Sequence, residues 1–275
     1  MPKRGSSPPD MEPAQEAQVL RYRPLQAVVI HEIIRVEGEA ELERPTSALI
    51  WSGLAAGLSM GFSYAAQAML THALPDVPWR HPVAAFGYTV GFAIVILGRQ
   101  QLFTESTLSA VLPTLTHRDR KTLMATLRLW AFVLAANVVG TWLFAAALAW
   151  ANPFGAEVRP DLAKLALQSM ADPFGTTFVK AVFAGWLIAL MAWLLPSAGT
   201  ARIFVILLLT WLVALGHLSH IIAGSAEAAY AVLTGAAGAG DYGWRFFLPT
   251  VLGNSLGGVA LVAMLNHAPV SHKLE

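Results

Sequence analysis

Six apolar segments constrain the fold of this 275-residue chain more than any other feature. They occupy roughly residues 47–70, 83–112, 127–151, 176–195, 202–235 and 246–266. A helix needs about 20 residues to cross a hydrocarbon core of about 30 Å, and every segment is long enough. Backbone in lipid must satisfy its own hydrogen bonds, which favours helices. We therefore expect an all-α integral membrane protein with six transmembrane helices.

Charge is scarce in this chain and unevenly distributed. Only 13% of the residues are charged, whereas ordinary soluble domains carry roughly 25%. Fourteen of the 35 charged residues lie within residues 1–45. We expect a disordered cytoplasmic tail at 1–24, an amphipathic helix at 25–44, a six-helix transmembrane domain at 45–268 and a cytoplasmic tail at 269–275.

The expected amphipathic helix has an apolar face and an acidic face. Its apolar positions follow a spacing of four, three and four, with two isoleucines beside them: Val29, Ile33, Val36 and Ala40, then Ile30 and Ile34. Such a helix lies on the membrane surface or docks on the protein's own body, and both alternatives stay open. Pro45 ends the helix, and we expect Thr46 to cap the first span.

The basic residues predict the orientation of the chain. With the N-terminus inside, twelve Lys and Arg side chains fall on the cytoplasmic side and five fall outside. The HRDRK cluster at 117–121 contributes most to this difference among the loops. The positive-inside rule then places both termini in the cytoplasm, in a bacterial inner membrane. No apolar stretch follows Lys3 and Arg4 before residue 46, so we expect no cleaved signal peptide.

Composition argues against several classes of function. The net charge is +1, without the concentrated basic face that nucleic-acid binding requires. Cysteine is absent, which excludes disulfides, thiolate metal sites and cysteine nucleophiles. The sequence shows no second catalytic cluster, and we expect neither an enzyme nor a bound cofactor or metal.

Two N-x-x-G elements lie at equivalent places in the third and sixth segments. They begin at Asn137 and Asn254, 117 residues apart. Small residues are common wherever membrane helices pack closely, so either element alone is weak evidence. We expect the two asparagines to tie interrupted backbone to neighbouring helices.

Polar residues interrupt the second and fifth segments, in GRQQLFTES at 98–106 and HLSHIIAGS at 217–225. Thr104 and His220 lie in these interruptions 116 residues apart, nearly the offset of the asparagines. The shared offset predicts a duplication of three helices. Because each half has an odd number of spans, the second copy must insert upside down. We expect two inverted three-helix repeats in which helices 2 and 5 are broken.

The interruptions have a predictable depth in the membrane. Residues 83–97 and 203–216 precede them and rise about 22 Å and about 21 Å along a helix. The two breaks then lie on opposite sides of the midplane, where unwound backbone must line a cavity or be buried in protein. Half-helix N-termini beside the breaks would present unpaired N–H groups to an anion. This pattern favours a permeation path over an enzyme.

His220 is the leading candidate for function. Histidine donates hydrogen bonds to anions and exchanges protons near neutral pH. A buried histidine bonded to a backbone carbonyl is the equally weighted alternative. Thr104 sits at the corresponding break, where its hydroxyl either faces the imidazole or bonds back to a helix carbonyl.

The other ionisable residues near membrane depth are Arg99, Glu105, His217 and Glu227. Such residues are rare in membranes and are usually functional or mutually paired. We expect Arg99 and Glu105 to form an ion pair that pins the first broken loop. His217 and His220 would share a helix face if the helix continued, but an unwound segment without further ligands disfavours a metal or haem.

Four motifs together resemble the formate/nitrite transporter family. They are LFTES at 102–106, AANVVG at 135–140, HIIAGS at 220–225 and GNSLGG at 253–258. The similarity covers roughly residues 45–268, with the motifs in the right order and spacing.

This resemblance implies an aquaporin-like protomer with its own pore, assembled as a homopentamer in the lipid bilayer. It implies passage of small monovalent anions such as formate or nitrite, often linked to protons. The family's central histidine falls on His220 and its L-F-T threonine on Thr104, next to Phe103. Its constriction falls approximately on Tyr88 and Val213.

Two hypotheses of function therefore remain. The first is a channel or transporter for small weak-acid anions, proton-linked through the central histidine. The alternative is a membrane scaffold or sensor that retains the transporter fold without transporting.

Overall fold

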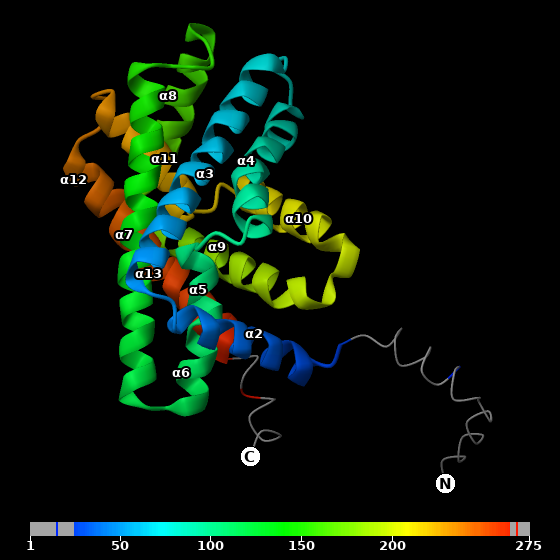
Figure 1. Cartoon of the computed structure of the whole chain (residues 1–275). Coiled ribbons are helices and arrows are strands. Elements are labelled where there is room, and N and C mark those ends of the chain that lie inside the picture. The colour runs from blue at the N-terminus through cyan, green and yellow to red at the C-terminus, as the bar shows by residue number, and fades with distance from the viewer. Residues whose placement is uncertain (1–14, 16–24, 265–267, 269–275) are drawn as a thin grey trace.

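The computed structural model describes residues 25–264 together with the isolated positions 15 and 268. The tails expected at 1–24 and 269–275 lie outside the described residues, apart from position 15. Within the described range every regular element is a helix (Figure 1). The α-helices are α2 (Ala27–Leu42), α3 (Thr46–Ala73), α4 (Arg80–Leu97), α5 (Phe103–Ser109), α6 (Val111–His117), α7 (Arg120–Trp150), α8 (Arg159–Gln168), α9 (Phe174–Leu194), α10 (Arg202–Leu215), α11 (Ile221–Leu233), α12 (Ala239–Asp241) and α13 (Leu248–Leu256).

The helices account for the six expected spans. Among the described residues, α3, α4, α7 and the segment Phe174–Ser197 are long and apolar enough to cross a membrane. The apolar helices α10 and α11 are shorter and together make the broken fifth span. The sixth span runs from Tyr242 to Met264, with π-helical turns on both sides of α13.

The spans form two inverted repeats of three helices. In the first half α3 packs on α4 and α7, and in the second half α9 packs on α10 and α13. The helices α4 and α10 both end in an unwound segment, beyond which α5 and α11 begin. Figure 1 shows α2 and α6 at one end of the bundle and α8 at the other. We call these the α2 end and the α8 end.

The two breaks have the same backbone conformation. Arg99 and His217 both adopt the left-handed region, with φ of 49° and 46°. The next amides reach back to carbonyls five residues earlier, from Gln100 to Val95 and from Leu218 to Val213, each at 3.0 Å. This is the Schellman ending of a helix, here without the usual glycine. The equivalence confirms the duplication.

The structure corrects the residue pairing within the repeat. The left-handed residues are 118 positions apart. At that offset the N-cap of α11, His220, corresponds to the N-cap of α5, Leu102, and both have φ near −110° and ψ of 125°. Thr104 is therefore not the counterpart of His220 within the repeat. The offset of 116 was a coincidence of two polar residues near the same break.

Glycine allows the central helices to approach closely in both halves. A Cβ on Gly57 of α3 would lie 2.1 Å from the carbonyl oxygen of Asn137. A Cβ on Gly185 of α9 would lie 2.3 Å from the carbonyl oxygen of Asn254. Small residues at such crossings bring backbones together where lipid gives no hydrophobic driving force.

Helix α2 docks on the protein's own body, against α5 and α6. Its buried residues are Ile30, His31, Ile34, Gly38 and Leu42. The buried face is displaced by about one residue from the expected apolar face, and Val29 and Val36 of the expected face are 40% and 50% exposed. The expected cap is also wrong: Pro45 holds the N-cap position of α3, and no side chain caps it.

The short helix α8 lies in a linker for which we expected no helix. Its residues Leu162 and Ala166, one turn apart, are buried against α3 and α11. The hydroxyl of Tyr64 donates a 2.6 Å hydrogen bond to the carbonyl oxygen of Leu162. The helix covers one end of the bundle and forms a wall of the cavities described next.

Candidate functional site

His220 and Thr104 meet at the centre of the protein. Thr104 Oγ1 lies 2.8 Å from His220 Nε2, and both side chains are buried. His220 is the N-cap of α11 and Thr104 is the second residue of α5, so the contact joins the two halves. Of the alternatives for Thr104, the structure shows the hydroxyl facing the imidazole.

The second ring nitrogen of His220 fixes its tautomer. The backbone N–H of Ala223 donates to His220 Nδ1 at 3.2 Å, which caps the start of α11. A nitrogen that accepts this bond carries no proton, so the ring proton is on Nε2. Nε2–H then donates to Thr104 Oγ1, which leaves the threonine hydroxyl hydrogen for another acceptor. The arrangement leaves the Thr104 hydroxyl as the hydrogen-bond donor of the central pair.

Asn137 holds the first broken helix in place. Its Oδ1 accepts from the backbone N–H of Phe103 at 3.0 Å, and its Nδ2 donates to the carbonyl oxygens of Gly53 and Gln101 at 2.7 and 2.9 Å. One amide thus satisfies three buried backbone groups on α3, α5 and the unwound segment. Such groups are costly to leave unpaired.

Asn254 makes the same set of bonds in the second half. Its Oδ1 accepts from the backbone N–H of Ile221 at 2.8 Å, and its Nδ2 donates to the carbonyl oxygens of Ala181 and Ser219 at 2.8 and 2.9 Å. The structure shows both asparagines tying broken backbone to neighbouring helices, as expected.

These bonds change the expectation for the half-helix N-termini. The first amides of α5 and α11, at Phe103 and Ile221, are bound by asparagine, and that of Ala223 is bound by His220. These three N–H groups are not free for an anion. Side chains rather than backbone amides therefore supply the polar groups of the central site.

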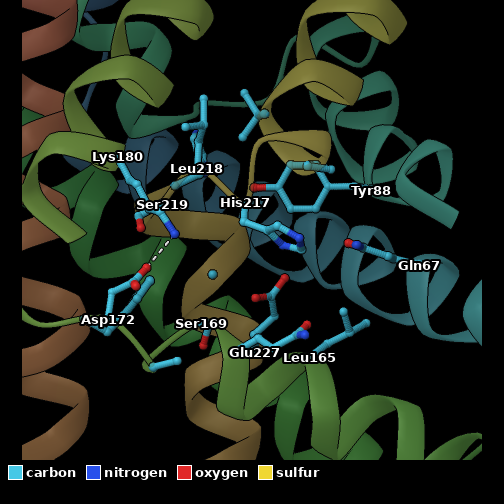
Figure 2. A pocket seen from close by; sticks show the side chains of 17 residues that line it. Gln67, Tyr88, Leu165, Ser169, Asp172, Lys180, His217, Leu218, Ser219 and Glu227 are labelled. Atoms are coloured by element: carbon cyan, nitrogen blue, oxygen red, sulfur yellow. Dashed lines mark hydrogen bonds and ion pairs between the residues drawn. The ribbon is translucent and has the colours of Figure 1, made fainter. Parts of the chain in front are cut away.

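A cavity of about 250 Å³ opens from the α8 end and reaches His220; we call it the α8 cavity. Tyr88, Val213, His217 and Glu227 line it, together with Gln67 of α3 and Lys180 of α9. Figure 2 shows the side chains of His217, Glu227 and Gln67 directed into this space. Sequence reasoning missed Gln67, because its role depends on the approach of α3 to the second break.

A neighbouring cavity of about 350 Å³ extends the α8 cavity outward. The two share Gln67, Leu165, Gln168 and His217 as lining residues. The outer cavity adds the basic side chains Arg80 and Lys164 and the imidazole of His81. Asp76 lines this cavity too and contacts Arg80 at 3.4 Å, so solutes at the α8 end meet charges of both signs before they reach the centre.

His217 stacks on His81, with ring centroids 4.3 Å apart and planes inclined by 11°. His81 Nε2 lies 3.2 Å from the carbonyl oxygen of Leu215, the last residue of α10. The pair joins the start of α4 to the second break. Because the backbone between His217 and His220 is unwound, the two do not share a helix face. Sequence reasoning missed His81, whose partner is 136 residues away.

A separate cavity of about 490 Å³ lies at the α2 end; we call it the α2 cavity. Arg99 contacts Glu37 of α2 at 3.5 Å and is 73% exposed. The expected Arg99–Glu105 pair is therefore wrong, because the left-handed backbone at Arg99 directs its side chain toward α2. Glu105 lines the α2 cavity and forms no ion pair within the described part of the chain.

Glu41 connects α2 to the first break. Its carboxylate accepts from Ser109 Oγ at 2.6 Å and from Gln101 Nε2 at 3.2 Å. Burial raises the pKa of Glu41, and the hydrogen bonds from Ser109 and Gln101 only partly oppose the rise. His117 of α6 adds a 2.6 Å contact to Glu39.

Four consecutive residues, Gln101 to Thr104, lead along the chain from the α2 cavity to the centre. Gln101 lines the α2 cavity, and Thr104 contacts His220. The residues between them, Leu102 and Phe103, are both buried. His220 lines the α8 cavity, and the α2 cavity shares no lining residue with that cavity.

The comparisons with known proteins agree with this architecture. A model of the formate/nitrite transporter family matches residues 28–268. The chain is 43% identical over 252 residues to the "Inner membrane protein YfdC" of Escherichia coli (strain K12), which covers 92% of this chain and 81% of that protein.

Solved structures show the same fold at low identity. A "Pentameric formate channel with formate bound" superimposes with a TM-score of 0.71 at 18% identity, covering 84% of this chain and 98% of that chain. An "FNT family ion channel" gives 0.73 at 19% identity, covering 88% and 96%. The matched family comprises channels and transporters rather than enzymes. This multi-pass membrane protein belongs to the formate/nitrite transporter family.

Proposed function

We propose that the chain passes small monovalent anions of weak acids, such as formate or nitrite, across the membrane together with a proton, with His220 at the centre of the path. The observation that carries this proposal is the buried contact between Thr104 and His220 at the inner end of the α8 cavity. Family membership and the similarity to a formate channel support it.

The chemistry of the path suits such a solute. An anion loses its water on the way through an apolar region, which is costly unless donors replace that water. Thr104 Oγ1 accepts from His220 Nε2–H and keeps its own hydrogen, so the Thr104 hydroxyl is the donor at the deepest point of the path. Tyr88 and Val213, which line the α8 cavity, form the constriction before it, and Phe103 closes the far side.

We also propose a homopentamer in the bacterial inner membrane with both termini in the cytoplasm. The name of the Escherichia coli relative supports the location, and the formate channel supports the assembly. The α2 end is then cytoplasmic, because it carries the basic cluster at 117–121. The α8 end faces outward.

Uptake of labelled formate and nitrite into proteoliposomes tests the function. The wild-type chain is expected to exceed empty vesicles, more so under an inward proton gradient. His220→Ala removes the imidazole whose Nε2–H holds the Thr104 hydroxyl and is expected to lower uptake roughly tenfold or more. His72→Ala, a half-exposed histidine that contacts Asp161 at 3.4 Å, is the matched control.

Two outcomes would count against the proposal. If the wild-type chain carries no small anion above empty vesicles, transport fails and the scaffold or sensor becomes the better hypothesis. If His220→Ala leaves uptake unchanged, the centre of the path lies elsewhere.

A further inference from the structure

Glu227 presents a carboxyl group to the α8 cavity. It lies on α11, seven residues beyond His220, and lines the α8 cavity. Within the described part of the chain no hydrogen bond or ion pair involves its side chain, unlike the carboxylates of Asp172 and Glu41. Figure 2 shows the carboxyl directed into the cavity, toward the side from which His217 enters.

Among the described residues that line the α8 cavity, the one Lys or Arg side chain is already paired. Lys180 of α9 lines the same cavity, but its ammonium is 2.5 Å from Asp172. The titratable groups that face or approach Glu227 from the packed elements are Tyr64 of α3, Tyr88 of α4, His217 and His220 of the second break, Asp172 before α9 and Lys180 of α9. A permanent carboxylate among these groups would repel the anion that the path receives.

His220 has no vacant nitrogen for an additional proton. Nδ1 accepts from the backbone N–H of Ala223, and Nε2 bonds to Thr104. A proton on Nδ1 would point at the N–H of Ala223 and break the cap of α11. The proton for a proton-linked passage is therefore better supplied elsewhere along the path.

We propose that Glu227 is the residue that transfers this proton in the α8 cavity. The anion enters past Arg80 and Lys164, and the carboxylic acid of Glu227 gives its O–H proton to an oxygen of the anion. The neutral acid then passes Val213 to reach His220 and releases its proton to water at the α2 end, and the Glu227 carboxylate regains a proton from a hydronium ion at the α8 end. This inference rests on the proposed function and locates its proton exchange.

The test uses the full-length chain in proteoliposomes, with labelled formate as the probe and equal pH on both sides. Uptake is measured from mildly acidic to mildly alkaline pH. Glu227→Gln keeps the shape and hydrogen-bond donors but cannot transfer a proton, so uptake is expected to fall roughly tenfold or more. Its pH profile is expected to lose a titration step. Glu157→Gln, an exposed carboxylate at the α8 end, is expected to behave as wild type.

Wild-type uptake and an unchanged pH profile in Glu227→Gln would overturn the inference, as would faster uptake, which would make the carboxylate a barrier. If Glu227→Gln fails to assemble, the same uptake measurement on Glu227→Asp tests the inference. Lower uptake with a displaced pH profile supports the inference, and an unchanged profile overturns it. Absence of uptake by the wild-type chain would instead overturn the proposed function.

Discussion

Asn137 and Asn254 show how much a single residue contributes to this fold. Each satisfies one buried N–H and two buried carbonyl groups around a broken helix. Their role could be predicted from the repeated N-x-x-G elements. Their partners could not, because Gly53 and Ala181 come from helices that approach only in the folded bundle.

Asn254→Leu keeps the approximate volume of the side chain but removes all three bonds. The N–H of Ile221 and the carbonyls of Ala181 and Ser219 then lack partners, which costs about 1–3 kcal/mol for each unsatisfied group. We expect a markedly lower midpoint of thermal unfolding in detergent. Val139→Ala, on a half-exposed position of α7, is the control, and equal midpoints for the two variants would contradict this role.

Thr104 and His220 show what could and what could not be predicted from the sequence. The contact between Thr104 and His220 could be anticipated, because both lie at polar interruptions. Whether the two residues are equivalent in the repeat could not be decided from their separation of 116 residues, because the offset between the halves depends on where each helix unwinds. The same is true of Arg99, whose left-handed backbone selects Glu37 rather than Glu105.

At the scale of elements, α2 is attached to the bundle through polar contacts at the first break. Its existence followed from the period of its apolar residues. The face that α2 buries could not be predicted in this way, because it includes Gly38. Gly38 lies against the backbone of Ser109, where a Cβ would lie 2.0 Å from the carbonyl oxygen. A pattern based on hydrophobic side chains overlooks a glycine contact.

The attachment of α2 is expected to depend on pH through Glu41. Its folded-state pKa is raised by burial, so its contribution is present at low pH and is lost as pH rises through that folded pKa. Hydrogen exchange along residues 27–42, corrected for intrinsic rates, should show stronger protection in acid. Glu41→Gln should remove this pH dependence. Glu43→Gln, at the exposed C-cap position of α2, should retain it. Equal protection at all pH values in the wild type would refute the link.

At the scale of the whole molecule, the lipid environment explains why the fold was predictable. Spans need a minimum length and an apolar composition, so six segments and their inversion could be read from the sequence. Helix α8 could not, because a ten-residue helix outside the membrane meets no such requirement. Because α8 was not predicted, the wall that it contributes to the α8 cavity could not be predicted either.

The inversion predicts matched consequences in the two halves. Gly57→Ala and Gly185→Ala each place a Cβ against the backbone of an asparagine. Overpacking of this kind costs about 1–3 kcal/mol, and we expect similar losses of thermal stability from both. Gly175→Ala is the control, since nothing lies within 4 Å of its added Cβ. A loss from only one of the two substitutions would show that the halves are not equivalent in packing.

The difference between Leu102 and His220, the two N-caps, has a consequence for direction. A solute from the α8 end meets imidazole and hydroxyl groups as it sheds water, whereas one from the α2 end first meets Leu102 and Phe103. The free-energy profile of a solute along the path is therefore asymmetric, although the backbones of the two halves are nearly equivalent. At concentrations that saturate the path, equal and opposite concentration differences should drive unequal fluxes, whereas at low occupancy the same barrier is crossed in both directions and the fluxes should be equal.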